Sequence, residues 1–209
     1  MNDRNGREGI LFVVSAPSGA GKTSLCRELI DSLPDLRQSI SFTTRPKREG
    51  ERDGVDYYFT TLETFQEMTS QNQLAEWAEV HGNLYGTSLK TLKTASEEGI
   101  DLLLDIDCQG AGQLKKNYQQ GVFIFILPPD YIELERRLCN RGTDDKDVIQ
   151  RRLKNAEHEI YQASWYDYIV INDDFNSAKE RLIAIVTAER CRSDRTTYLL
   201  EKFTIKGDK

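Results

Sequence analysis

A short stretch near the start of the chain combines residue types that bind phosphate. The segment VSAPSGAGKTSL, residues 13–24, places Gly19 and Gly21 before Lys22 and Thr23. Glycines let a backbone approach an anion closely, and the N–H groups at the start of a helix point toward it. A lysine can reach the terminal phosphates of a nucleoside triphosphate while a neighbouring hydroxyl binds Mg²⁺. A turn alone would not need Lys22, so the stretch predicts a phosphate-binding loop.

One position departs from the usual pattern of such loops. The pattern G-x-x-x-x-G-K-[ST] is met by Gly21, Lys22 and Thr23, but Ala16 replaces its first glycine. The alternative interpretation is a tight turn that caps an ordinary helix. The strand-like run ILFVV before the loop and the helix-like GKTSLCRELIDSL after it favour the phosphate site.

Two carboxylates follow a second apolar run, in LLLDIDCQG. Because alternate side chains of a strand share a side, Asp105 and Asp107 are expected on the same side of one sheet edge. Ligands of open α/β sheets bind at the carboxyl ends of strands, where a Mg²⁺ shell would find oxygen ligands or acceptors for its waters. A pair of solvated aspartates is the alternative, which the neighbouring phosphate loop disfavours.

Two groups of basic residues suit phosphates in a chain that is acidic overall. The first lies in a turn-rich segment with Tyr57 and Tyr58, where guanidinium forks and phenol donors suit a phosphate monoester. In the second, Arg137 and Arg141 are four residues apart and share a helix face. A salt-bridged surface is the alternative for both groups. The groups are Arg45, Lys47, Arg48 and Arg52, then Arg136, Arg137, Arg141, Arg151 and Arg152.

The elements that must position these residues follow an α/β pattern. Four apolar runs are continuously hydrophobic, as in strands covered on both faces, and helix-length segments lie between and after them. This alternation predicts an α/β fold with a mostly parallel sheet. Polar, turn-rich and aromatic residues at 39–95 interrupt it and indicate an insert. The runs are 10–14, 100–106, 121–127 and 166–171, and the helical segments include 21–33, 129–138, 145–162 and 176–202.

Composition excludes several classes of protein. The 209 residues carry 28 basic and 34 acidic side chains, a formal net charge of -6, which argues against a broad basic face for nucleic acid. The four cysteines show neither zinc nor disulfide spacing and fit a reducing cytoplasm. No run approaches the roughly 18 apolar residues of a membrane span, and the polar start has no signal-type core. We expect a soluble cytoplasmic protein, for which a homo-oligomer is compatible with the sequence.

Together these segments resemble the guanylate kinase family. The resemblance rests on SAPSGAGKTS, SISFTTRPKREGERDGVDYYF, EWAEVHGNLYGT, LDIDCQG and RLCNRGTDDKDVIQRRL, in the family's order. It implies a P-loop NTPase-type core, with a parallel sheet flanked by helices, a GMP-binding insert and a small helical lid. It also implies that ATP donates its γ-phosphoryl group to GMP or dGMP, with Mg²⁺, in purine nucleotide metabolism. The implied core is about residues 1–40, 93–129 and 157–209, the insert about 41–92 and the lid about 130–156.

The resemblance also implies roles for individual residues. On the ATP side it implies loop residues Ala16, Pro17, Ser18, Gly19, Ala20, Gly21, Lys22, Thr23 and Ser24, with Asn172 near the adenine. On the GMP side it implies Arg45, Arg48, Tyr57 and Tyr85 for the phosphate, and Ser41, Glu76, Thr87 and Asp107 for the rest of the nucleotide. The implied catalytic residues are Lys22, Arg45, Arg137, Arg141 and Arg152. Thr23 and Asp105, the latter through water, would hold Mg²⁺.

The chemistry of guanine agrees with the two base-reading residues. A carboxylate such as Glu76 can accept from both N1–H and N2–H₂, while a hydroxyl such as that of Thr87 donates to O6. Adenine has an acceptor at N1, so GMP is expected to be strongly preferred over AMP. Without the resemblance, Glu76 would be interpreted as an exposed acid beside Trp77.

Three other functions are alternatives. A GTPase would share the phosphate loop, but the chain has no N-K-x-D stretch. A kinase of another nucleoside monophosphate or of a phosphorylated sugar would need a different acceptor pocket. A non-catalytic guanylate-kinase-like module would bind phosphorylated peptides, although such modules typically lose the loop residues that persist here as Gly21, Lys22 and Thr23.

Overall fold

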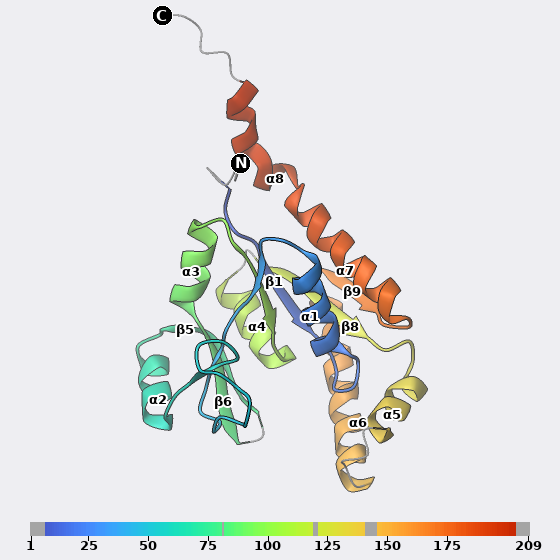
Figure 1. Cartoon of the computed structure of the whole chain (residues 1–209). Helices are drawn as coiled ribbons and strands as arrows, with labels where there is room; N and C mark the ends of the chain where they lie inside the picture. The colour runs from blue at the N-terminus through green and yellow to red at the C-terminus, as the bar shows by residue number, and fades with distance from the viewer. Residues whose placement is uncertain (1–6, 81, 119–120, 141–145, 204–209) are drawn as a thin grey trace, which may run out of the picture.

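The computed structural model describes residues 7–80, 82–118, 121–140 and 146–203. Its centre is a parallel sheet of five strands in the order β2-β7-β1-β8-β9 (Figure 1). The four predicted apolar runs are confirmed as strands, whereas the fifth strand, β2, was not predicted because only one of its three residues is buried. The strands are β1 (Leu11–Ser15), β2 (Leu36–Gln38), β7 (Asp101–Asp105), β8 (Val122–Leu127) and β9 (Tyr168–Ile171).

Helices cover both faces of this sheet, which explains why strands such as β1 and β8 are almost continuously hydrophobic. Phe12 and Val14 pack with residues of α1 and α7 on one face, while Leu11 and Val13 pack with residues of α3 and α4 on the other (Figure 1). The α/β prediction is therefore confirmed. The helices are α1 (Lys22–Ser32), α3 (Leu89–Glu97), α4 (Cys108–Asn117) and α7 (Phe175–Arg190).

The segment predicted to be an insert forms a second sheet, in the order β4-β3-β6-β5. Its longest strands, β5 and β6, form an antiparallel hairpin, and Phe65 of α2 is buried against Gly86 of β6. The side chain of Gln113, in α4, bonds to both the N–H and the carbonyl of Trp77 and so fixes β5 to the core. The elements are β3 (Phe42–Thr43), β4 (Tyr58–Phe59), α2 (Leu62–Ser70), β5 (Leu74–Val80) and β6 (Asn83–Ser88).

Two helices on the other side of the molecule form the segment expected to be a lid. Helices α5 (Tyr131–Cys139) and α6 (Lys146–Tyr161) share a small apolar cluster that includes Leu134, Leu138 and Leu153. The short helix η1 (Gln162–Trp165) then leads to β9. In Figure 1 the second sheet and the pair α5 and α6 lie on opposite sides of the sheet edge at which β1 ends.

The expected helix at 176–202 is wrong in its length. Helix α7 ends at Arg190, and Arg192 takes an extended conformation with φ -58 and ψ 138 before α8 (Ser193–Thr196) and η2 (Thr197–Phe203). No glycine or proline marks this break, so composition could not predict it. Within the described part of the chain, no helix has the length and apolar character needed to cross a membrane.

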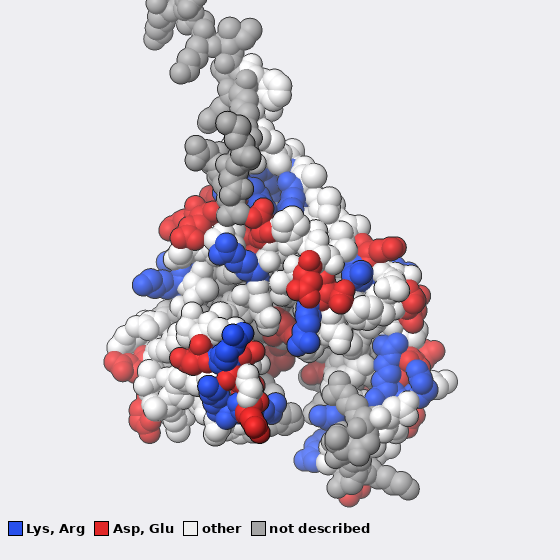
Figure 2. Space-filling view, in the orientation of Figure 1, with Lys and Arg blue, Asp and Glu red and all other residues white. Residues whose placement is uncertain are grey.

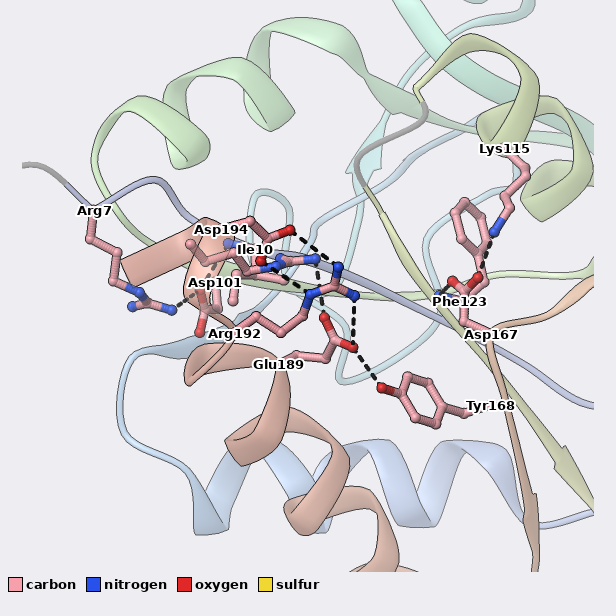
Figure 3. Close-up of polar contacts among 11 residues, drawn as sticks. Arg7, Ile10, Asp101, Lys115, Phe123, Asp167, Tyr168, Glu189, Arg192 and Asp194 are labelled. Atoms are coloured by element: carbon pink, nitrogen blue, oxygen red, sulfur yellow. Dashed lines mark hydrogen bonds and ion pairs between the residues drawn. The ribbon is translucent and has the colours of Figure 1, made fainter. Parts of the chain in front are cut away.

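A buried carboxylate joins the start of the chain and the end of α7 to the amino edge of the sheet. The Asp101 side chain is 0% exposed, and its Oδ1 accepts from the Arg7 guanidinium at 2.5 Å and from the Ile10 N–H at 2.8 Å. Its Oδ2 accepts from Arg190 Nε at 2.7 Å. Figure 3 shows Arg7 and Ile10 directed at Asp101. These contacts compensate a charge that burial alone would penalise by several kcal/mol, on the order of the usual desolvation cost.

Candidate active site

The predicted phosphate loop lies between β1 and α1. Gly19 and Gly21 have φ values of 95 and 92, and Gly21 is the N-cap of α1. This left-handed conformation strains residues with a side chain, which explains why glycine occupies both positions. Ala16 belongs to the buried core and Ala20 is 0% exposed, so the replacement of the first glycine by alanine places a small side chain in packed surroundings.

Lys22, the first residue of α1, lies against the end of β7. Its Nζ is 2.6 Å from Asp105 Oδ1 and donates to the Ile106 carbonyl at 2.9 Å. Burial lowers the pKa of Lys22, but the attraction of Asp105, with a smaller contribution from Asp107, outweighs it and holds this pKa above its usual value. The structure therefore brings together the predicted loop lysine and the predicted carboxylates.

The two aspartates lie in different elements. Strand β7 ends at Asp105, and Asp107 is the N-cap of α4, where its Oδ1 accepts from the Gly110 N–H at 2.8 Å. The expectation that both continue one strand is therefore wrong, because the chain leaves the sheet between them to start the helix. Both carboxylates still act on Lys22.

Glu76 and Thr87 are opposite one another in the β5–β6 hairpin. The Thr87 hydroxyl donates to Glu76 Oε1 at 2.5 Å, and Glu76 is only 4% exposed. Burial, assisted by Asp107 and opposed by Thr87, raises the pKa of the Glu76 carboxyl to about 7. A Cβ on Gly110 would lie 2.5 Å from Glu76 Oε2, so the absence of a side chain on α4 provides room for the carboxylate.

The residues expected to bind the acceptor phosphate form a basic and aromatic cluster. The Arg45 guanidinium bonds to Glu51 at 2.7 and 3.1 Å and lies 5.4 Å from the centre of the Tyr57 ring. A hydrogen bond with Tyr85 contributes, after Glu51, to raising the pKa of Arg45. The rings of Tyr57 and Tyr85 meet edge to face at 5.9 Å.

Two further residues of the expected acceptor site lie at its margin. The Arg48 side chain is exposed, while its backbone N–H donates to Glu51 Oε2 at 2.8 Å. Ser41 is half-buried, and its carbonyl accepts from the Tyr58 N–H at 2.9 Å. Glu51, which organises this loop, was not predicted because nothing distinguishes it from the other charged residues in RPKREGER.

On the donor side, the structure ties Arg137 to its surroundings in two ways. Its Nε donates to Glu133 at 2.7 Å, and its Nη2 donates to the Asn172 carbonyl at 3.0 Å. The Arg136 guanidinium also binds Glu133 and, together with Arg137, lowers the pKa of the Glu133 carboxyl to about 2. The alternative that this basic group forms surface salt bridges thus holds for Arg136 and Arg137. Arg152 lies half-buried on α6, and Arg141 lies outside the described residues.

Sequence reasoning missed Glu159, in the last turn of α6. Burial raises the pKa of the Glu159 carboxyl, and the Ser18 N–H of the phosphate loop and the charge of Lys22 act in the opposite direction. The chain gives no local signal for this contact, because Glu159 is one of several acids in a charged helix.

These elements surround one hollow. Figure 2 shows it between the second sheet and the α5–α6 pair, with Lys and Arg side chains on both of its sides. The phosphate loop lies at the sheet edge between them, where open α/β folds bind ligands (Figure 1). The basic side chains on both sides of the hollow suit phosphate groups, and the buried Glu76 carboxylate can accept hydrogen bonds.

Comparisons with known proteins agree with this geometry. The family model described as guanylate kinase matches residues 8–189. The chain is 61% identical over 189 residues to a guanylate kinase of Syntrophotalea carbinolica, with 90% of each chain covered. It is 55% identical to that of Geobacter metallireducens, covering 97% of this chain and 98% of the relative. A solved guanylate kinase from Anaplasma phagocytophilum is 34% identical, with a TM-score of 0.75 over 96% of this chain and 98% of that one. This chain belongs to the guanylate kinase family.

Proposed function

We propose that the protein transfers the γ-phosphoryl group of ATP to GMP, giving ADP and GDP. The observation that carries this proposal is the buried Glu76–Thr87 pair, in a chain of this family whose phosphate loop keeps Gly21, Lys22 and Thr23. A GTPase would not need a second site with a buried carboxylate. dGMP is included as an acceptor, because none of the contacts proposed for GMP involves its 2′-hydroxyl.

The acceptor base would be read by Glu76 and Thr87. The Glu76 carboxylate would accept from N1–H and N2–H₂ of guanine, and the Thr87 hydroxyl would turn from Glu76 toward O6. Adenine would place its N1 lone pair against the carboxylate. A site built to hydrogen-bond a substrate rejects an analogue lacking the matching group by roughly 10⁴-fold or more. Asp107 and Ser41 would complete this side of the nucleotide.

The acceptor phosphate would bind at the Arg45, Tyr57 and Tyr85 cluster, with Arg48 at its margin. Arg45 now faces Glu51, so a phosphate would either join or replace that carboxylate. Guanidinium groups bind phosphate through parallel charge-assisted hydrogen bonds, which fixes the orientation of the attacking oxygen. This oxygen is already anionic near neutral pH, so the reaction needs no strong general base.

The donor triphosphate would lie on the loop from Ala16 to Ser24, with Lys22 on its terminal phosphates. Phosphoryl transfer passes through a loose transition state whose charge spreads over the equatorial oxygens. Positioned cations therefore supply most of the catalysis. We assign this role to Lys22, Arg45, Arg137, Arg141 and Arg152, with Asn172 on the adenine side of the loop.

Mg²⁺ is proposed to accompany ATP. Within the described ranges no three His, Cys, Asp or Glu side chains gather to form a metal cage. Mg²⁺ usually keeps several waters and binds through one or two protein oxygens plus substrate phosphates, which fits the Thr23 hydroxyl and the Asp105 carboxylate. When bound, the ion would neutralise charge on the transferring group.

Closure of the insert and the lid over both nucleotides is part of the proposal. Water would otherwise accept the phosphoryl group, so the hollow must close before transfer. We also propose that the protein acts in the cytoplasm, where GMP is recycled, since all four cysteines are free thiols. It would need no nucleic acid or membrane partner, and a homo-oligomer is compatible with the proposal.

The test is ADP production from ATP and Mg²⁺ with GMP, AMP, UMP, CMP, dTMP or no acceptor. The Lys22→Ala variant is the control, and its turnover is expected to fall on the order of 100-fold or more. Turnover with GMP and little ADP without acceptor would support the proposal. Turnover with another acceptor would assign a related kinase and overturn the roles of Glu76 and Thr87.

Inactivity of a folded sample with every acceptor would favour the interaction module instead. Melting temperature then separates the two readings, because ATP with Mg²⁺ stabilises only a protein that has a working donor site. A module that had lost this site would melt at the same temperature with or without the nucleotide.

A further inference from the structure

One residue at the end of β9 joins three parts of the site. Asn172 directly follows β9 and is 5% exposed. Its peptide N–H donates to the Leu127 carbonyl at the end of β8, at 2.7 Å. Its side-chain Nδ2 donates to the Ala20 carbonyl at 2.7 Å, and its own carbonyl accepts from Arg137 at 3.0 Å. The sheet, the phosphate loop and α5 therefore meet at one buried residue.

The contact with the phosphate loop is tightly fitted. Ala20 is 0% exposed, so its carbonyl has little access to water as an alternative partner. A Cβ on Gly21 would lie 2.5 Å from Asn172 Nδ2, and Gly21 also has a positive φ. The amide thus occupies the space left by the glycine that caps α1, immediately before Lys22. Movement of this amide would be transmitted to the start of the helix.

The contact with α5 fixes a guanidinium that is proposed to face the phosphates. Arg137 is held through Nε by Glu133 and through Nη2 by the Asn172 carbonyl. A guanidinium has five N–H donors, and within the part of the chain that the structure describes these two contacts engage Nε and Nη2. Because the Asn172 backbone is anchored to β8, it gives Arg137 a fixed point on the sheet.

We infer that Asn172 is a positioning residue for phosphoryl transfer, which holds the Ala20–Gly21 end of the phosphate loop and the Arg137 guanidinium in a fixed relation to each other. This inference rests on the proposed function. It follows that losing the amide donor would misplace the phosphate loop relative to Arg137, whose own contact is with the Asn172 backbone carbonyl. A displacement of about 1 Å at a reacting centre can lower the rate by roughly 100-fold.

The experiment compares Asn172→Asp and Asn172→Ser with the neighbouring Asp173→Asn as matched control. Aspartate has the shape of asparagine but presents an oxygen to the Ala20 carbonyl, whereas serine is neutral and too short to reach it. Asp173 is exposed and pairs with Arg181. We expect kcat to fall by about 10- to 100-fold in both Asn172 variants, with KM for GMP changed by less than about threefold. The control should match the wild type.

A double-mutant cycle distinguishes positioning from a general loss of structure. If Asn172 acts by setting the phosphate loop relative to Arg137, the Asn172→Ser change should matter less once Arg137 is gone. We expect its fold-loss in kcat to be at least about three times smaller in an Arg137→Ala background than in the wild type. Melting temperatures identify variants that are folded under the assay conditions. An unchanged kcat in a folded Asn172 variant, or effects that simply multiply, would overturn the inference. A wild-type protein inactive with GMP would overturn the proposed function instead.

Discussion

The raised pKa of Glu76 predicts a pH dependence of GMP affinity that the structure allows us to calculate. Only the ionised carboxylate can accept from both guanine donors, so affinity scales with the ionised fraction of Glu76 in the free protein. With a pKa of about 7, this fraction is about 0.9 at pH 8 and about 0.1 at pH 6, since each pH unit changes the ratio of the two forms tenfold. The dissociation constant for GMP should therefore rise about tenfold between pH 8 and pH 6.

The assay is isothermal titration of the protein with GMP across this pH range. The phosphate of GMP also titrates, near about pH 6 for a phosphate monoester, so the wild type must be compared with Glu76→Gln. Glutamine keeps the size and one acceptor but does not ionise, and we expect its affinity at pH 8 to be on the order of 100-fold lower because one guanine donor is left unpaired. Any pH dependence that remains in this variant belongs to the ligand.

The difference between the two pH profiles isolates the contribution of the carboxyl. We expect the wild-type constant to rise about tenfold more than that of Glu76→Gln between pH 8 and pH 6. Parallel profiles would show that the ionisation of Glu76 does not control GMP binding, and would refute the reasoning from burial to base recognition. A midpoint near the ordinary glutamate pKa would likewise show that the carboxyl is solvated in the free protein.

Three further predictions concern stability and specificity. The Glu76 pKa is higher in the folded than in the unfolded protein, so ionisation of Glu76 destabilises the fold as pH rises from about 4.5 through about 7. Glu76→Gln should therefore raise the free energy of unfolding at pH 8, measured by urea denaturation, by up to about 3 kcal/mol. An unchanged free energy of unfolding would contradict this prediction. Gly110→Ala places a methyl group against the Glu76 carboxylate and should raise KM for GMP by at least about tenfold without changing KM for ATP; equal changes for both nucleotides would indicate a general distortion. Asp101→Asn removes a buried charge that Arg7 and Arg190 compensate, and it should lower the free energy of unfolding by about 3 kcal/mol. The kcat should not change, because Asp101 lies at the edge of the sheet opposite to the phosphate loop. A reduced kcat in the folded variant would contradict that separation.

The sequence predicted the sheet well because four of its strands are apolar runs, of which β1, β7 and β8 are almost wholly buried. Continuous apolar runs such as VFIFIL carry their own signal, whereas β2 is short, contains Arg37 and Gln38, and forms a strand only through its pairing with β7. The break after α7 was missed for a similar reason. Nothing in the sequence around Cys191 excludes a helix, so the end of α7 at Arg190 could not be predicted from residue types.

The site divides in the same way between local and distant causes. The phosphate loop could be predicted because its glycines, lysine and hydroxyl all lie within residues 19–23. The burial of Glu76 could not, because it depends on the hairpin partner Thr87 and on Gly110, which belongs to another element. Glu51 and Glu159 are ordinary acids in charged segments, and only the folded chain places them on Arg45 and on the loop. Residue types therefore predicted which chemistry is present, but only the folded structure shows which acidic residues take part in it.

Strand β7 has a carboxylate at each end, and the two carboxylates serve different purposes. Asp101 is fully buried and holds the chain together, while Asp105 faces Lys22 at the phosphate loop. The four residue steps between them span about 13 Å of extended backbone. Substitutions that strengthen or weaken the network around Asp101 should therefore alter how long the enzyme survives heating without altering how fast it works. Directed evolution for heat resistance can therefore vary the residues around Asp101 independently of catalysis.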